Sequence, residues 1–95
     1  MEKEQSLRAV ITVVGVDRVG IIARITGALA ALGINILDIS QTIRGDLFTM
    51  SMIVELGGAT KPFVQVRDEL VSLGQEMGME IHAQREDVFR FMHRI

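Results

Sequence analysis

The segment Val14-Gly15-Val16-Asp17-Arg18-Val19-Gly20-Ile21 joins an apolar run that is typical of a strand to a pattern that is typical of a helix. Its two glycines permit positive φ angles and close backbone approach, and Asp17 stands where it would cap the first helical turn. The amides of residues 19–22 are helix-start donors without intrahelical partners. Such a loop suits a small polar or anionic ligand, although any short strand-to-helix turn needs the same glycines for purely structural reasons.

Hydrophobic spacing on both sides of this loop predicts the first strand and the first helix. Residues 7–15 include the unbroken run Val10-Ile11-Thr12-Val13-Val14, which suits a central strand. After the loop, apolar residues recur at steps of three and four, which predicts a helix over about residues 20–32 that ends before Gly33. These residues are Ile22, Ile25, Leu29 and Leu32. The helix is otherwise rich in alanine and glycine, which indicates either a face for close backbone approach or alanine's helix propensity alone.

Two strand-like runs follow, over residues 34–44 and 47–56, and the connection Gly45-Asp46 predicts a tight antiparallel hairpin. Alternation in the second run predicts that one row of side chains faces the helices and the other faces a wetter or shared surface. The first row is Phe48, Met50, Met52 and Val54, and the second is Leu47, Thr49, Ser51, Ile53 and Glu55. Methionine at this spacing within a strand indicates core packing rather than a metal site or a promiscuous groove.

Thr60-Lys61-Pro62 is typical of a helix opening, with a hydroxyl cap and a proline in the first turn. Steps of three and four then predict an amphipathic helix that ends at Gly78, and alternation predicts a last strand over residues 79–85. The resulting order is βαββαβ. Right-handed crossovers give an α+β, ferredoxin-like sandwich, in which a four-stranded antiparallel sheet carries both helices on one face. This domain spans residues 7–85 and leaves the other face of its sheet uncovered.

Residues 86–95 are additional to this architecture and form a short amphipathic C-terminal tail. Val88, Phe91, Met92 and Ile95 stand at helical spacing beside Arg90, His93 and Arg94. Such a segment needs a surface, and the tail would pack on its own sheet, pack on a partner subunit, or remain frayed. Two of the four phenylalanines, Phe89 and Phe91, fall here, and the large area that aromatic burial removes from water favours docking.

Length and composition indicate one small domain. The chain has 95 residues, of which 48% are hydrophobic, a formal net charge of -2 and no cysteine. This charge argues against a nucleic-acid surface, and the missing thiols exclude disulfides, thiol catalysis and thiolate metal sites. Residues 1–6 are polar and lack an apolar signal core, and no run is long enough to span a bilayer. We therefore expect a cytoplasmic protein that binds neither nucleic acid nor membranes.

Residues that commonly carry catalysis are scarce. No Ser-His-acid order and no metal-ligand spacing occurs, so we expect no catalytic residue, no metal and no cofactor. His82 and His93 leave open a metal site between subunits. Acylphosphatases share this element order, and Arg18 or Arg24 with Asn35 would fill their phosphate-holding roles, but the loop lacks their fuller glycine-rich sequence. An RNA-binding sheet of the RRM type needs aromatic residues on its central strands, and the first strand has none.

Several segments together give the chain a family resemblance. Residues 15–22, the helix end Leu32-Gly33 and the run Ile34-Asn35-Ile36-Leu37-Asp38 resemble an ACT domain, a regulatory amino-acid-sensing module attached to many metabolic enzymes. The Asp-Arg-x-Gly-Ile form is similar to that of nitrogen-sensing uridylyltransferases, formyltetrahydrofolate deformylases and the glycine-cleavage repressor, except that Val19 replaces their usual proline. Residues 88–95 resemble the C-terminus of small stand-alone prokaryotic ACT proteins of uncharacterised function.

The resemblance implies a dimer in which two sheets merge side by side. It also implies that a ligand binds between the first loop of one subunit and the start of the second strand of its neighbour. The ligand-binding residues would then be Asp17, Arg18, Val19, Gly20, Asn35 and Ile36. Helix-start amides with Arg18 suit an α-carboxylate, while Asp17 and Asn35 suit an α-ammonium group.

We therefore expect a non-enzymatic homodimer that binds an amino acid or similar metabolite and acts in trans on a partner enzyme or regulator. A ligand can regulate only if it binds one assembly state better than another. The alternative is an interaction protein that dimerises as a scaffold without a small-molecule ligand. The exposed sheet face and the amphipathic tail are compatible with both hypotheses.

Overall fold

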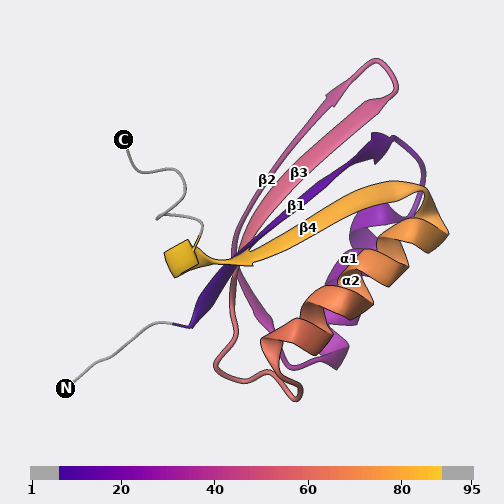
Figure 1. The fold of residues 1–95 in the computed structure, drawn as a ribbon. Coiled ribbons are helices and arrows are strands. Elements are labelled where there is room, and N and C mark those ends of the chain that lie inside the picture. The colour runs from indigo at the N-terminus through magenta and orange to yellow at the C-terminus, as the bar shows by residue number, and fades with distance from the viewer. Residues whose placement is uncertain (1–6, 89–95) are drawn as a thin grey trace.

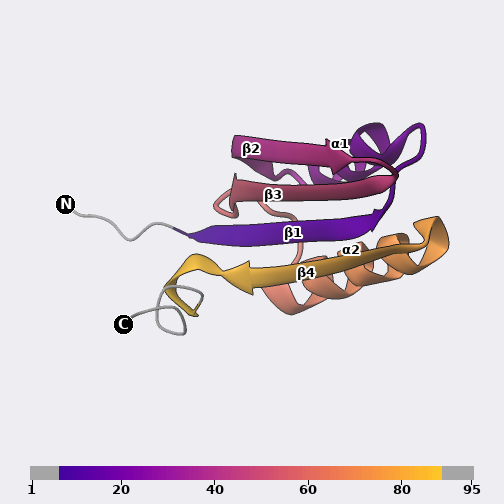
Figure 2. The same ribbon diagram turned by 90° about the horizontal axis from the view of Figure 1, so that it is seen from above.

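The computed structural model describes residues 7–88, whose elements follow the order βαββαβ (Figure 1). These elements are β1 (Arg8–Val16), α1 (Ile21–Ala31), β2 (Asn35–Arg44), β3 (Leu47–Glu55), α2 (Phe63–Met77) and β4 (Met79–Arg85). The strands form one antiparallel sheet in the order β2-β3-β1-β4. Both helices lie on the same face of that sheet, as the view from above also shows (Figure 2). The predicted ferredoxin-like arrangement is confirmed.

Strand alternation builds the core between the sheet and the helices. The buried residues of β1 are Ala9, Ile11 and Val13, and those of β3 are Phe48, Met50, Met52 and Val54. The predicted core-facing row of β3, with its two methionines, is therefore confirmed. Ile25 and Leu29 from α1 and Val66 and Leu70 from α2 close the core from the other side. Burial of this apolar surface is the main favourable term in the folding of the domain.

The start of α1 differs from the prediction. Its N-cap is Gly20, at φ +93°, and no side chain donates or accepts a capping hydrogen bond there. Asp17 does not cap the helix, because its backbone amide donates to the carbonyl oxygen of Asp46 at 2.7 Å and holds it at the β2–β3 hairpin. The end of the helix agrees with the prediction, since Gly33 follows it at φ +76°.

The predicted hydroxyl cap of the second helix is also wrong. α2 begins at Phe63 with Pro62 as N-cap, and no side chain caps it. Thr60 is instead tied to the end of α1, because its amide donates to the Leu32 carbonyl oxygen at 2.9 Å and its hydroxyl to the same oxygen at 3.4 Å. These bonds link the two helix-flanking loops. α2 ends at Gly78, as predicted.

Gly27 is open to solvent in the middle of α1. A Cβ added there would have no atom within 4 Å apart from the helix's own neighbouring backbone. We expect Gly27→Ala to stabilise the domain by about 1 kcal/mol, because glycine is the poorer helix former. Urea unfolding at low protein concentration measures this change. Destabilisation would instead indicate that another molecule packs closely on this helix.

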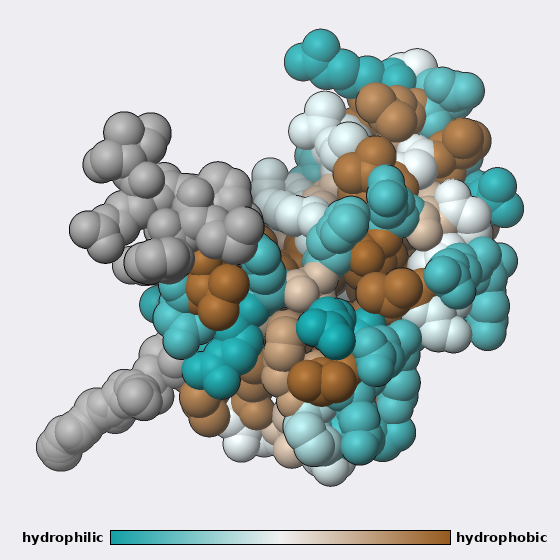
Figure 3. All heavy atoms as spheres, viewed as in Figure 1, coloured by the Kyte–Doolittle hydropathy of each residue, from teal (hydrophilic) through white to brown (hydrophobic). Residues whose placement is uncertain are grey.

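β2 is an edge strand with little cover. Every residue of β2 except Ile36 is exposed, including the aliphatic residues Leu37, Ile39 and Ile43. The space-filling view shows apolar and polar side chains intermixed on the side that it presents (Figure 3).

In the part of the chain that the structure describes, no helix has the length and apolar content needed to cross a membrane.

Candidate functional site

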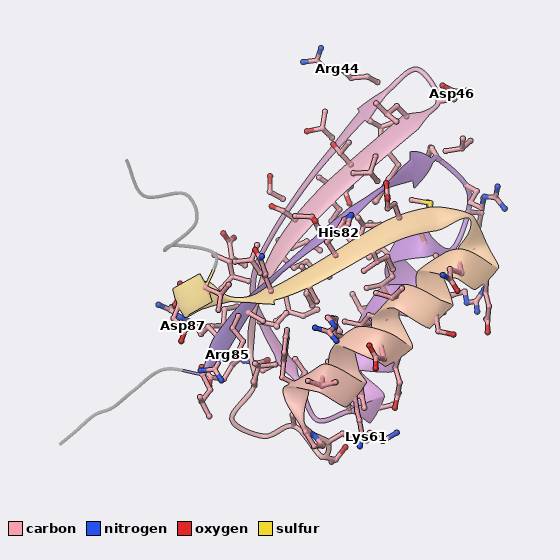
Figure 4. The ribbon with its side chains drawn as sticks, in the orientation of Figure 1. Arg44, Asp46, Lys61, His82, Arg85 and Asp87 are labelled. Atoms are coloured by element: carbon pink, nitrogen blue, oxygen red, sulfur yellow. The ribbon has the colours of Figure 1, made fainter. Side chains whose placement is uncertain are left out.

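The loop between β1 and α1 lies at the hairpin end of the sheet. Val16, the last residue of β1, is the register partner of Leu47, and the amide of Asp17 is bonded to Asp46 in the β2–β3 turn. Figure 4 shows Arg44 and Asp46 at this end, with Arg85 and Asp87 at the opposite end. The loop is therefore positioned by the β2–β3 hairpin, which is distant from it in sequence.

A pocket of about 220 Å³ opens between this loop, the first turn of α1 and the end of β2. Its lining residues are Asp17, Arg18, Gly20, Ile21, Ile22, Ala23, Gln41, Ile43 and Phe48. The loop and β2 supply the polar groups, and the helix and strands supply apolar walls. The pocket thus combines charged groups of both signs with a hydrophobic surface, which is the usual composition of a small-molecule site.

The N-terminal end of α1 carries positive partial charge where it meets the pocket. α1 has eleven residues, no acidic residue in its first turn and no side-chain cap. Its first amides therefore carry partial positive charge that no carboxylate of the first turn offsets. Among residues 7–88, the side chains of Arg18 and Asp17 form no hydrogen bond or ion pair. A carboxylate ligand would be attracted by both the helix start and the Arg18 guanidinium.

Arg18 also extends toward the end of α2. Its Nη2 atom lies 3.7 Å from the position that a Cβ would take at Gly78, which caps α2. The C-terminal end of a helix carries partial negative charge, so it favours a cation there. Arg18 is exposed and therefore extends from the start of α1 toward the end of α2.

The structure brings together only some of the predicted site residues. Asp17, Arg18 and Gly20 line the pocket, whereas the side chain of Val19 is fully exposed and does not line it. Asn35 and Ile36 lie at the other end of the sheet, because Asn35 is the register partner of Glu55. Ile36 is half-buried and packs against the core. Within one chain, the loop and the start of β2 therefore lie at opposite ends of the sheet.

Gln41 and Ile43 line the pocket but were missed by the prediction. They belong to the row of β2 that faces the helix side, together with Ile39, because their register partners in β3 are the core residues Met50 and Phe48. A polar residue in an otherwise aliphatic row was the available signal. It was not decisive because the sequence alone did not show which β2 residues adjoin the loop.

Residues 8–84 match the family described as the ACT domain, which covers more than half of the chain. The chain belongs to the ACT domain family. It is 47% identical over 89 residues to a UPF0237 protein of Listeria innocua, an alignment that covers 94% of this chain and all of the relative. It is also 47% identical over 88 residues to a UPF0237 protein of Methanocaldococcus jannaschii, covering 93% of this chain and 98% of that relative.

Solved structures agree with this ACT domain assignment. An ACT domain protein from Streptococcus pneumoniae superposes with a TM-score of 0.78 and 39% identity, covering 90% of this chain and 96% of that one. A putative glycine cleavage system transcriptional repressor superposes with a TM-score of 0.75 and 29% identity, and the match covers 86% of this chain and 47% of that one. The regulatory subunit of aspartate kinase from Thermus thermophilus, in its ligand-free form, superposes with a TM-score of 0.64 and 28% identity. That match covers 83% of this chain and 51% of the other.

The ACT domain does not assemble the acylphosphatase constellation within one chain. Arg24 is paired with Glu76 at 3.0 Å, and Asn35 is at the far end of the sheet from the loop. Within residues 7–88, no group of three or more histidine or acidic residues is arranged to hold a metal ion. His82 is exposed, with Nε2 3.8 Å from a carboxylate oxygen of Glu80, and His93 lies outside the described residues.

Proposed function

We propose that this ACT domain is a non-enzymatic regulatory module that binds an amino acid or similar small metabolite at a homodimer interface. It would then act in trans on a partner enzyme or regulator. ACT domains are commonly regulatory small-molecule-binding modules, and two similar structures are named as a transcriptional repressor and as the regulatory subunit of a kinase. These names support regulation as the class of function.

The observation that carries the proposal is the bare edge of β2. This ten-residue strand has exposed aliphatic side chains at Leu37, Ile39 and Ile43. A long unpaired edge with exposed aliphatic side chains is a template for pairing with another strand, and soluble proteins rarely leave one uncovered. Pairing with β2 of a second copy would satisfy its free backbone groups and extend the sheet.

Antiparallel pairing of the two β2 strands would also complete the ligand site. Asn35 and Arg44 stand at opposite ends of β2, roughly 30 Å apart at the rise of a strand. In a two-fold dimer, Asn35 of one copy would therefore lie near Arg44 of the other, at the end where the loop pocket opens. The separation of the predicted residues within one chain is thus what a shared site requires.

The pocket chemistry favours an α-amino acid with an apolar side chain. The start of α1 and Arg18 would hold the α-carboxylate, and Asp17 with Asn35 of the second copy would accept from the α-ammonium group. Ile22, Ile43 and Phe48 line the pocket and would contact the aliphatic part of the ligand. Binding at an interface would favour one assembly state over another, which is how the ligand would alter affinity for a separate partner.

Thermal unfolding of the purified protein with each proteinogenic amino acid tests this proposal. A ligand that binds only the native state adds about 2.7 kcal/mol of stability at a hundredfold excess over its Kd. We expect a selective rise in Tm that Arg18→Ala abolishes. Arg67→Ala is the matched control, because Arg67 lies on α2, does not line the pocket and, within residues 7–88, pairs with its neighbour Asp68.

A dimerising scaffold without a ligand is the alternative function. It rests on the same exposed β2 edge, together with the loss of the preorganising proline at Val19. In that case no compound would raise the Tm, and Arg18→Ala would leave partner binding unchanged. Absence of any shift across the panel would therefore favour the scaffold over the sensor.

A further inference from the structure

The face of the sheet opposite α1 and α2 has no covering element within residues 7–88 (Figures 1 and 2). Alternation assigns Arg8, Val10 and Thr12 to this face, because their neighbours in β1 are buried against the helices. Val10 is the register partner of Ile53 in β3, and both are only partly buried. We call this pair the open-face patch.

The described chain ends on the side of this uncovered face. The Nε atom of Arg8, a residue of the open face, donates to a carboxylate oxygen of Glu86 at 3.1 Å. Residues 86–88 are helical, and Val88 is exposed. The contact between Arg8 and Glu86 therefore directs the chain toward the open face as it leaves β4.

We propose that the chain's own last seven residues, 89–95, cover the open face and pack their apolar side chains on Val10 and Ile53. The apolar residues Val88, Phe91, Met92 and Ile95 recur at helical spacing, so one apolar side would be available to the patch. This docking goes beyond the proposed function, because the open face is neither part of the ligand pocket nor part of the β2 edge.

The length of this segment fits the width of the sheet. Residues 89–95 together with the three helical residues before them, 86–88, would span about 15 Å in helical form, at 1.5 Å per residue. The distance from β4 to β2 across the other strands is about 14 Å, at the usual strand spacing. The segment would therefore reach from the end of β4 to β2.

Charge distinguishes the open face from the nearest alternative surface. Arg90 and Arg94 of the segment are cationic, and the open face carries the carboxylates of Asp38 and Glu55 at the same end of the sheet. The alternative is an apolar pocket of about 200 Å³ beside the start of α2, to which Lys61 and Arg85 contribute. Both of these cations are already paired with carboxylates, Lys61 with Glu69 and Arg85 with Asp87. Asp38 on the open face has no ion pair among residues 7–88, so charge complementarity favours the open face for the arginines of the segment.

Cysteine pairs in the full-length chain test this proposal, because the natural sequence has no cysteine. The first pair is Ile53→Cys with Met92→Cys. The matched control is Lys61→Cys with Met92→Cys, since Lys61 lies at the same end of the molecule but lines the pocket beside α2. We expect a short thiol-specific cross-linker to join the first pair about tenfold faster, because docking raises the effective concentration of the two thiols.

A second measurement uses Ile53→Cys alone. Its maleimide labelling should accelerate by about tenfold when Phe91→Asp is added, because a charged side chain disfavours packing on an apolar patch. Equal cross-linking of both pairs, or faster cross-linking at Lys61, would overturn the proposal. Cross-links that form only between isotopically distinguishable copies would also overturn it, because the occupant would then be a second chain.

Discussion

Gly33→Ala should destabilise the domain by about 3 kcal/mol, combining the cost of a left-handed backbone with that of a steric clash. Gly33 has a φ of +76°, and a Cβ built there would lie 2.4 Å from the carbonyl oxygen of Gly58. The opposing atom belongs to the backbone, so it cannot rotate away as a side chain would. Chemical denaturation at high and at low protein concentration measures the change.

Gly45→Ala is the matched control for this prediction. Gly45 also has a positive φ, of +61°, but nothing lies within 4 Å of an added Cβ. We expect a loss of only about 1 kcal/mol, which is the conformational cost alone. Equal effects of the two substitutions would contradict a steric clash between a Cβ at residue 33 and the backbone of Gly58.

Ile39→Asp should dissociate the proposed dimer while leaving the monomer folded. Ile39 is 43% exposed in the single chain, so an aspartate there is readily hydrated. If two β2 edges pair around a two-fold axis, each subunit would place one unpaired aspartate charge in the interface. We expect the dimer Kd to rise at least about a hundredfold, which is about 2.7 kcal/mol, in sedimentation equilibrium.

Val64→Asp supplies the comparison for the β2 edge. Val64 is 55% exposed on α2, on the helix layer rather than on the strand edge. It should leave both the dimer Kd and the circular dichroism spectrum unchanged. If Val64→Asp weakened the dimer and Ile39→Asp did not, the helices rather than the β2 edge would form the interface.

The sequence predicted elements well where local chemistry determines them. The strands, the helices and the hairpin at Gly45 follow from hydrophobic period and turn residues, and the core row of β3 follows from alternation. The N-caps of both helices were predicted wrongly because tertiary contacts place these two residues away from the helix starts. Asp17 is held by Asp46, and Thr60 is held by Leu32.

The candidate site was predicted less completely than the fold. Asp17, Arg18 and Gly20 are adjacent in sequence, so one motif identified the loop side of the pocket. Gln41 required the register between β2 and β3, which the sequence does not contain directly. The role proposed for Asn35 depends on a second copy, and no pattern within one chain determines how two copies would meet.

Complementation between two defective variants tests the shared site most directly. Arg18→Ala and Asn35→Ala should each abolish ligand binding in its own homodimer. When the two proteins are unfolded and refolded together, each mixed dimer would contain one site with both substitutions and one with neither. We predict that calorimetry recovers about a quarter of the wild-type sites, since random pairing makes half of the dimers mixed. No recovery in verified mixed dimers would contradict a ligand site built from two chains.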